Sequence, residues 1–468
     1  MNLVREFKKN IEENNLLSTG DKVLLAVSGG ADSLSMLDLF FRLKDDFAVD
    51  IALIHLDHQF RKESAQEAAF VEQKAEELGI DFYTKKVNLP EIINQENISA
   101  EAAARRERFD FFREIYFKYN FDLLALAHHQ DDQAETVLLN LFRGSGLRGL
   151  SGIEKSLKLK GLKVIHPLLD FSKKEILKYC QDNNLKPRYD SSNKENIYSR
   201  NIIRNKILPI IEAEINPAVK DVIARNAKLI ADEEQFLNKI AEKKYNNCLI
   251  SSESDKLVLE LKTLNNYDQV MKRRIFRIAY QLLKADLEDL YLEHILEIEK
   301  LLNDLTTGRG IDLPASIRVE ISYEHLIFFK KNIIESRKIT RKKLLELNKK
   351  NKFNSIYVLE AFIKARDNID LNANSSQAVI DIEKVALPLY MRSRKKGDSF
   401  IPLGMQGKKK LKDIFIDQKV PKFKRDQIPI IVDSRGDIVW VSGFRIADDY
   451  KVTAETEKVL VLKLKNNN

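Results

Sequence analysis

The stretch from Val23 to Leu43 constrains the fold of this chain most. An aliphatic run over 23–27 is followed by Ser28-Gly29-Gly30-Ala31-Asp32-Ser33 and then by apolar residues at helical spacing. This order predicts a strand, a tight turn and the start of a helix. Adjacent glycines let the backbone approach a ligand, and the free N–H groups and dipole of a helix N-terminus favour an anion. The stretch therefore predicts a phosphate site, with the hydroxyls of Ser28 and Ser33 as further donors.

The loop lacks the signatures of two common nucleotide-binding turns. No Gly-Lys-Ser/Thr follows, as a Walker A loop requires, and the third glycine of a dinucleotide-binding fingerprint is missing. Because Gly-Gly also occurs in ordinary turns between a strand and a helix, the loop alone does not decide between a plain turn and a binding site.

The composition fits a large intracellular protein. The chain has 468 residues, 44% of them hydrophobic, and 78 Lys+Arg against 70 Asp+Glu give a net charge of +8, which is compatible with a polyanionic partner. The charged N-terminus lacks the apolar part of a secretory signal, and no apolar run is long enough to cross a bilayer. Cys180 and Cys248 are far apart and lack partners at metal-ligand spacing. We therefore expect a cytoplasmic protein without membrane association.

Strands and helices alternate up to about residue 209. Further strands are expected at 49–55, 81–87, 121–127 and 163–165, with helices such as 63–78 and 99–119 between them. This alternation predicts an α/β domain with a doubly wound parallel sheet, whose ligands bind at the carboxyl ends of the strands.

The rest of the chain follows other patterns. Helical periodicity over 218–245 and 267–305 predicts a mainly helical middle domain, with short strands over 311–330. From residue 378 onward, a β pattern interrupted by glycines predicts a small α+β C-terminal domain. The predicted domain ranges are 1–214, 215–335, a connecting segment at 336–375, and 376–468.

Two strand exits carry candidate site residues in addition to the glycine loop. His55 and His58 flank Asp57 after the second strand, where nucleotide contact is favoured over a metal site because metal-ligand partners are missing nearby. After the fourth strand, His128-His129-x-Asp131-Asp132-x-x-Glu135 runs into a helix, so that Asp132 and Glu135 share one helical face near its positive end. Helix capping explains one acid there. The pair favours a site that holds Mg²⁺ on ATP phosphates or binds a cationic amine.

Basic residues supply candidate phosphate contacts. Within Arg105–Arg108, one arginine suits a surface ion pair and another suits a phosphate. Arg200 and Arg204 share a helical face beside Asn201, which fits phosphate contact, although a solvated helix with a buried Ile stripe gives the same pattern. The segment 392–425 holds 12 Lys+Arg against 3 acids and is interleaved with aromatic residues, as in RNA-binding surfaces.

Taken together, these motifs resemble a known family. Ser-Gly-Gly-Ala-Asp-Ser after a strand resembles the pyrophosphate loop of the ATP-pyrophosphatase (PP-loop) enzymes, and the whole chain resembles the tRNA(Ile)-lysidine synthetases. Gln59-Phe60 departs from that family, which often carries a glycine there. The resemblance runs in order through Ser28–Ser33, His55–Arg61, Glu101–Arg108, Ala127–Ser151, Asp190–Arg204 and Gly397–Gly443.

The resemblance implies a two-step ligation. ATP adenylates O2 of the wobble cytidine in the CAU anticodon of tRNA(Ile), and the ε-amine of free L-lysine then attacks C2 and displaces AMP. It implies ATP and Mg²⁺ as cofactors and tRNA and lysine as partners, and a homodimer is compatible with the sequence.

The resemblance also implies roles for individual residues. The residues implied to bind ATP are Ser28, Gly29, Gly30, Ala31, Asp32, Ser33, His55 and Arg105, with Asp32 and Asp132 as Mg²⁺ ligands. The residues implied to be catalytic or to orient lysine are Asp32, Arg108, His128, Asp132 and Glu135. The residues implied to bind tRNA are Arg143, Arg148, Arg200, Asn201, Arg204, Arg392, Arg394, Lys408, Lys409, Lys410 and Lys412.

Two alternatives stay open at this stage. A tRNA thiolase of the same superfamily is disfavoured because Cys180 and Cys248 do not supply a cysteine pair. A non-catalytic RNA-binding protein derived from the fold would have lost the acids, yet Asp32, Asp132 and Glu135 are all present.

Overall fold

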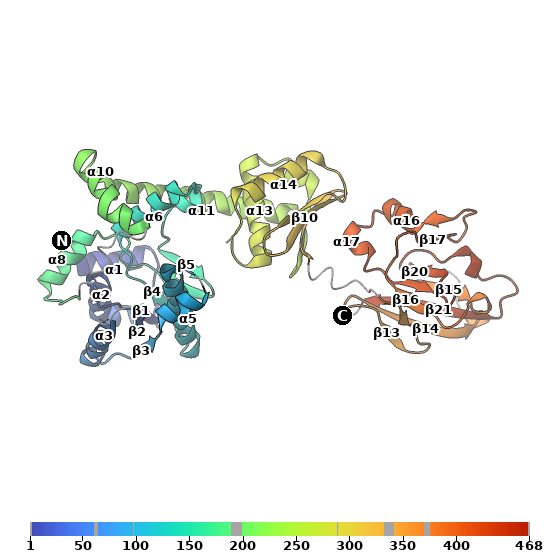
Figure 1. Cartoon of the computed structure of the whole chain (residues 1–468), viewed down its shortest axis with the longest axis horizontal. Coiled ribbons are helices and arrows are strands. Elements are labelled where there is room, and N and C mark those ends of the chain that lie inside the picture. Colours follow the sequence, from blue (N-terminus) through green and yellow to red (C-terminus); the bar gives the residue numbers. More distant parts are fainter. Residues whose placement is uncertain are drawn as a thin grey trace. The chain divides into compact units, whose positions relative to one another are not determined.

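The structure is a computed structural model, which describes residues 2–59, 64–96, 98–188, 199–287, 289–331, 341–368 and 375–466. The chain divides into two compact units, Met1–Leu237 and Asn238–Asn468 (Figure 1). The domain ranges given above stay predictions. Among the described residues, no helix is both long enough and apolar enough to cross a membrane.

The first unit is built on a six-stranded sheet in the order β3-β2-β1-β4-β6-β5. The pairings from β3 through to β6 are parallel, and the edge strand β5 is antiparallel to β6. The chain builds outward from β1 to β3 and then returns to place β4 on the other side of β1, so the topological switch point lies between β1 and β4. The strands are β1 (Lys22–Ala26), β2 (Asp50–Asp57), β3 (Phe82–Lys86), β4 (Leu123–Ala125), β5 (Ser156–Leu159) and β6 (Leu162–Ile165).

Helices cover both faces of this sheet. Val23 and Leu25 of β1 pack in one core cluster with residues of α1, α2 and α8, whereas Leu24 between them packs in a second cluster with residues of α5. This alternation confirms the predicted doubly wound α/β fold. The helices are α1 (Leu3–Glu13), α2 (Ala31–Phe47), α3 (Ser64–Leu78), α4 (Leu89–Glu96), α5 (Ala100–Lys118), α6 (Gln130–Phe142), α7 (Leu147–Leu150), α8 (Lys173–Asp182), α9 (Ser199–Ile202), the π-helical turn η2 (Ile203–Ile207), α10 (Leu208–Glu214) and α11 (Val219–Cys248).

The second unit begins with helices packed on a five-stranded antiparallel sheet in the order β7-β8-β11-β10-β9. Helices were predicted here together with the last three strands, but the hairpin β7–β8 was not, because its few residues fall between two long helical patterns. These elements are β7 (Leu249–Glu253), β8 (Lys256–Glu260), α12 (Leu261–Asn265), α13 (Gln269–Lys284), α14 (Leu292–Asp304), β9 (Gly310–Leu313), β10 (Ile317–Ser322) and β11 (His325–Lys330).

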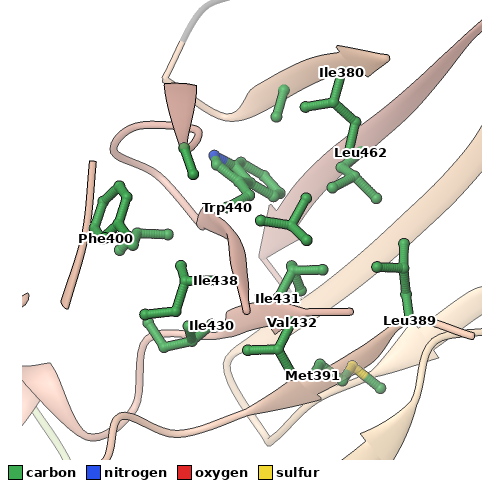
Figure 2. Packing of buried hydrophobic residues seen from close by; sticks show 14 of the residues in the cluster. Ile380, Leu389, Met391, Phe400, Ile430, Ile431, Val432, Ile438, Trp440 and Leu462 are labelled. Carbon is green, nitrogen blue, oxygen red and sulfur yellow. The ribbon is translucent and has the colours of Figure 1, made fainter. Parts of the chain in front are cut away.

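The C-terminal part contains two four-stranded sheets, β12-β16-β19-β20 and β13-β14-β21-β15. Their shared core surrounds Trp440, which is 1% exposed and lies among aliphatic side chains such as Ile431 and Leu462 (Figure 2). This mixture of strands and helices confirms the predicted α+β C-terminal domain. Its elements are β12 (Lys343–Leu344), β13 (Lys350–Lys352), β14 (Tyr357–Ala365), η3 (Arg366–Asn368), β15 (Gln377–Asp381), η4 (Ile382–Lys384), β16 (Tyr390–Arg392), β17 (Ser399–Phe400), β18 (Lys409–Lys410), α16 (Leu411–Asp417), α17 (Lys422–Arg425), β19 (Ile430–Val432), β20 (Ile438–Val441), η5 (Asp448–Tyr450) and β21 (Lys458–Asn466).

Candidate active site

The glycine loop joins β1 to α2 in the conformation expected for an anion site. Gly29 has a φ of +83°, which favours glycine, and Gly30 is the N-cap of α2. The Ser33 hydroxyl donates to the carbonyl of Gly30 at 3.1 Å and accepts from the N–H of Ser28 at 3.2 Å. Ser33 is 4% exposed. Its hydroxyl therefore holds the loop in shape around the free helix N-terminus.

A histidine near the C-terminal end of β2 supports the same loop. His55 is buried, and its Nδ1 lies 2.8 Å from the carbonyl oxygen of Val27. Burial lowers the pKa of His55, so the ring is neutral at pH 7 and donates its Nδ1–H to that carbonyl. Farther along this exit, Gln59 has a φ of +47°, the left-handed conformation that glycine adopts readily. The departure at Gln59 therefore leaves the turn intact, while Phe60 and Arg61 lie outside the described residues.

The acids of the fourth strand exit face two arginines. Asp132 and Glu135 are 7% and 1% exposed. Asp132 Oδ1 accepts from Arg200 Nη2 at 3.1 Å and from Arg204 Nη2 at 2.9 Å, and Glu135 Oε2 accepts from Arg200 Nε and Arg204 Nη2, both at 2.8 Å. The arginine side chains are 32% and 35% exposed. Two carboxylates and two guanidinium groups thus form one charge-balanced cluster.

This cluster sets the ionisation of Asp132. Burial alone would raise its pKa, but the neighbouring His129 and Arg200 side chains and the hydrogen bond from the backbone N–H of His129 at 3.0 Å lower it to about 2. In the same cluster Glu135 raises the pKa of Arg204 against the effect of burial. Asp132 and Arg204 are therefore both charged throughout the physiological pH range.

His128 lies beside the cluster as a neutral imidazole. Its ring centroid is 4.8 Å from that of His166, in an edge-to-face arrangement. Burial, and then the charge of His166, lowers the pKa of His128 to about 3. Its Nδ1 is buried without a hydrogen-bond partner among the described residues. His128 therefore offers an unused polar atom to a ligand at the exit of β4.

His129 connects the acidic cluster to the glycine loop. Its Nε2 lies 3.8 Å from Asp32 Oδ2 and 3.4 Å from Asp132 Oδ2, and its side chain is 6% exposed. Asp32, in the first turn of α2, also accepts from Lys173 Nζ, at 2.6 Å and 2.8 Å. The two predicted site regions thus meet at the switch point between β1 and β4.

The predicted arginines of α5 fall into two kinds. Arg106 pairs with Glu96 and Glu107, as predicted for a surface ion pair. Arg108 is exposed and its Nη2 lies 3.4 Å from His58 Nε2, at the exit of β2. Burial, with the charge of Arg108 second, lowers the pKa of His58 to about 4. Arg105 is exposed and lies over the Phe109 ring. Arg105 and Arg108 therefore remain accessible to a ligand.

The predicted RNA contacts of the first unit lie in two places. Arg143 and Arg148 are exposed at and beyond the C-terminal end of α6, with Arg143 about 12–17 Å along that helix from the acidic cluster. Arg200 and Arg204 lie in the cluster itself, and their contact with RNA stays a prediction. Asn201, between them, is part of α9. The preceding motif at 190–198 is outside the described residues.

The basic segment of the C-terminal part lines a pocket of about 520 Å³. Arg392 is buried and pairs with Asp398 through two hydrogen bonds of 2.7 Å and 2.9 Å, which disfavours its predicted contact with RNA. Lys408 is exposed outside the pocket, and Lys409 pairs with Asp417. The pocket is lined by Arg394, Lys395, Lys396, Gly397, Asp398, Lys410, Leu411, Lys412 and Asp426.

Sequence reasoning missed Lys173, His166 and Lys220. Lys220 of α11 pairs with Asp131 at 2.9 Å, and the backbone N–H of Lys173 donates to the same carboxylate at 3.0 Å. A signal for Lys173 did exist, because Ser172 and Glu175 form a capping box that marks a helix start after β6. Among the described residues, no group of three or more His, Cys, Asp or Glu side chains is arranged to hold a metal ion.

Comparisons with known proteins show what this chain is similar to. The model of the PP-loop domain family matches residues 1–211, and that of the TilS substrate C-terminal domain matches residues 389–463. A tRNA(Ile)-lysidine synthase of Caldanaerobacter subterraneus is 35% identical over 98% of this chain and 97% of its own length. One of Clostridium acetobutylicum is 32% identical over 99% of each chain. A solved U34-tRNA thiolase of Methanococcus maripaludis matches 49% of this chain and 80% of its own, with 22% identity and a TM-score of 0.41.

Proposed function

This chain belongs to the tRNA(Ile)-lysidine synthase family, and on that premise we propose that it joins free L-lysine to the wobble cytidine of the CAU anticodon of tRNA(Ile), giving lysidine. ATP is the activating substrate of this C–N ligase reaction. AMP and pyrophosphate are the other products.

One observation carries the proposal: His129 lies between Asp32 of the phosphate loop and Asp132 of the acidic cluster. A ligase of this kind needs a triphosphate and a cationic amine close to one acceptor atom. The phosphate loop suits the first and the buried carboxylates suit the second. Their meeting at one switch point supports a single two-substrate site.

The first chemical step activates the base. O2 of the cytosine attacks the α-phosphorus, the bond from that phosphorus to the bridging oxygen breaks, and pyrophosphate leaves with the electron pair. The backbone N–H groups at the start of α2 bind the triphosphate, and the helix dipole stabilises its charge. Arg105 and Arg108, which are exposed at the neighbouring strand exit, are available to further phosphate oxygens.

The second step transfers lysine. Its ε-amine, after loss of a proton, attacks C2, and the C2–O2 bond breaks to release AMP, a much better leaving group than an unactivated carbonyl oxygen. Asp132 and Glu135 orient the ammonium group before attack. His128 stays neutral because burial holds its pKa near 3, so its role is hydrogen bonding to the base or the amine. His128 is too weakly basic to take the ammonium proton.

The donor set supports Mg²⁺ at one of the two predicted residues. Mg²⁺ is usually held by one or two carboxylates together with substrate phosphates, and Asp32 is 27% exposed at the phosphate loop, where it could serve as such a ligand. Asp132 fits less well, because its Oδ1 already accepts from two arginines and its Oδ2 from a backbone N–H. When bound, the ion would neutralise phosphate charge.

The remaining parts of the proposal concern the contacts with tRNA, the location of the enzyme in the cell and its oligomeric state. Arg143 and Arg148 near the C-terminal end of α6, and the pocket around Arg394, Lys410 and Lys412, are the proposed contacts with tRNA phosphates. We place the enzyme in the cytoplasm, where tRNA and ATP are found, and a homodimer remains compatible with its sequence.

Incubation with ATP, labelled lysine and tRNA(Ile) carrying a CAU anticodon tests the function directly. We expect label in the tRNA, and AMP formed in equal amount. A transcript in which the wobble cytidine is replaced by uridine is the matched control and should stay unlabelled. Absence of label in the cytidine transcript, or equal label in both, would refute the proposal.

A further inference from the structure

Lys173 and Asp32 form an ion pair that joins the start of α8 to the phosphate loop. Lys173 is the first residue of α8, on a segment 141 residues away from Asp32 in the chain. Its Nζ lies 2.6 Å and 2.8 Å from the two carboxylate oxygens of Asp32. The two side chains are 37% and 27% exposed, so a ligand can reach both.

Helix electrostatics argue against a purely structural purpose for this lysine. The N-terminus of a helix carries partial positive charge, so a cation in the first turn of α8 is disfavoured there. An exposed ion pair contributes little to stability in return. A residue whose charge opposes the helix dipole, with no gain in stability in return, is most often found at a functional site.

The backbone around Lys173 is fixed by a second carboxylate. Its N–H donates to Asp131 Oδ1 at 3.0 Å, and Asp131 Oδ2 accepts from Lys220 Nζ at 2.9 Å. Ser172 caps the helix, with its hydroxyl accepting from the Glu175 N–H. The start of α8 is therefore fixed beside the first turn of α6, while the four-carbon stem of Lys173 lets its ammonium group move.

We infer that Lys173 is a triphosphate-binding residue, which takes the place of the lysine that a Walker A loop carries in its own sequence. Without nucleotide it pairs with Asp32. With ATP bound, its ammonium group moves to the β- and γ-phosphate oxygens. As the bond between the α-phosphorus and the bridging oxygen breaks, the electron pair stays on pyrophosphate, whose added charge Lys173 stabilises while keeping its own proton.

The inference rests on the proposed ATP site but not on lysine transfer, so it is tested by binding alone. The probes are α,β-methylene-ATP, inorganic pyrophosphate and AMP, measured by calorimetry on the full chain without tRNA or lysine. The variant is Lys173→Gln, and Lys174→Gln on the exposed neighbouring position is the matched control. A third variant, Lys173→Arg, keeps the positive charge of the side chain and tests whether that charge is what matters.

A charge-assisted hydrogen bond to phosphate predicts that Lys173→Gln weakens binding of the ATP analogue and of pyrophosphate by about 10- to 100-fold. AMP, which lacks the β- and γ-phosphates, should bind within about twofold of wild type on the same reasoning. Lys174→Gln should match wild type, and Lys173→Arg should recover most of the loss.

Three results would overturn the inference. One is unchanged pyrophosphate affinity in Lys173→Gln, and another is an equal loss for AMP, which would mean a general disturbance of the loop. The third is a Lys173→Gln protein that is unfolded at the assay temperature, which would make the ion pair structural. A wild type that binds pyrophosphate through Lys173 but transfers no lysine would refute the proposed function and leave this inference standing.

Discussion

Asp132→Asn separates the electrostatic role of the acidic cluster from its shape, because asparagine nearly matches aspartate in size. The aspartate pKa falls from 3.8 to about 2 in the folded protein, and the side chain is 10% exposed. A shift of nearly two pKa units corresponds to about 2 kcal/mol of stability at neutral pH. For a unit of this size, each kcal/mol of lost unfolding free energy lowers the Tm by about 2–4 °C. The Tm of the variant should therefore be about 4–8 °C below that of wild type.

The sign of the pH dependence follows from the lowered pKa. A depressed carboxyl pKa stabilises the fold at pH values above about 4 and loses this contribution as the pH falls toward 2. Wild type and Asp132→Asn should therefore differ in Tm at pH 7 and converge as the pH falls to about 2 and below. Circular dichroism melts across this range measure the difference. Asp182→Asn, an exposed position on α8, is the control and should follow wild type throughout.

Activity measurements on the same variant test the functional part. We expect Asp132→Asn to bind tRNA and ATP as wild type does and to transfer no measurable lysine, because the neutral amide cannot orient an ammonium group. A variant with the Tm of wild type at pH 7 would refute the electrostatic reasoning. Unchanged lysine transfer would remove Asp132 from the active site.

The remaining predictions concern the loop, the C-terminal part and the order of binding. Gly29→Ala places a side chain at a φ of +83° with its Cβ 3.4 Å from Phe70, so we expect a loss of about 1–2 kcal/mol in unfolding free energy and a raised KM for ATP. Arg392→Gln leaves Asp398 unpaired, so we expect a lower Tm but an unchanged salt dependence of tRNA binding, whereas a reduced slope would show that Arg392 contacts phosphate. Lysine should bind at least tenfold more tightly with tRNA present than without it in equilibrium dialysis, and equal affinities would contradict a charge-balanced cluster.

The elements of this fold that could be predicted from the sequence are those whose residues follow a strong periodic pattern. The strand at 23–27, the glycine loop and the alternation up to residue 209 all follow from apolar periodicity and two glycines, and the parallel sheet follows from them. The hairpins β5–β6 and β7–β8 were not fully predicted, because each contains short strands whose pairing depends on tertiary contacts.

The candidate site was predictable in its residue types but not in its pairings. Convergence of the strand exits placed Asp32 and Asp132 at one edge of the sheet, and the structure brings both to His129. That Arg200 and Arg204 face the acids could not be read from spacing, because they lie 65 or more residues away in the chain. Lys173 was missed as well, because the capping box of Ser172 and Glu175 marks a helix start but does not show that the lysine faces Asp32.

Charge balance in the acidic cluster bears on the order of the two chemical steps. Asp132 and Glu135 together carry two negative charges, and Arg200 and Arg204 carry two positive ones, so the cluster by itself has little attraction for a lysine ammonium group. A tRNA phosphate, or the phosphate of an adenylated base, competes for the arginines because a guanidinium group forms paired hydrogen bonds with phosphate as readily as with carboxylate. When an arginine binds phosphate instead, a buried carboxylate loses its partner. The free energy of that unpaired charge is high until another cation binds to it. We therefore predict that the cluster binds lysine poorly in the free enzyme and more tightly once the RNA is in place, so that lysine enters after the base is positioned for activation.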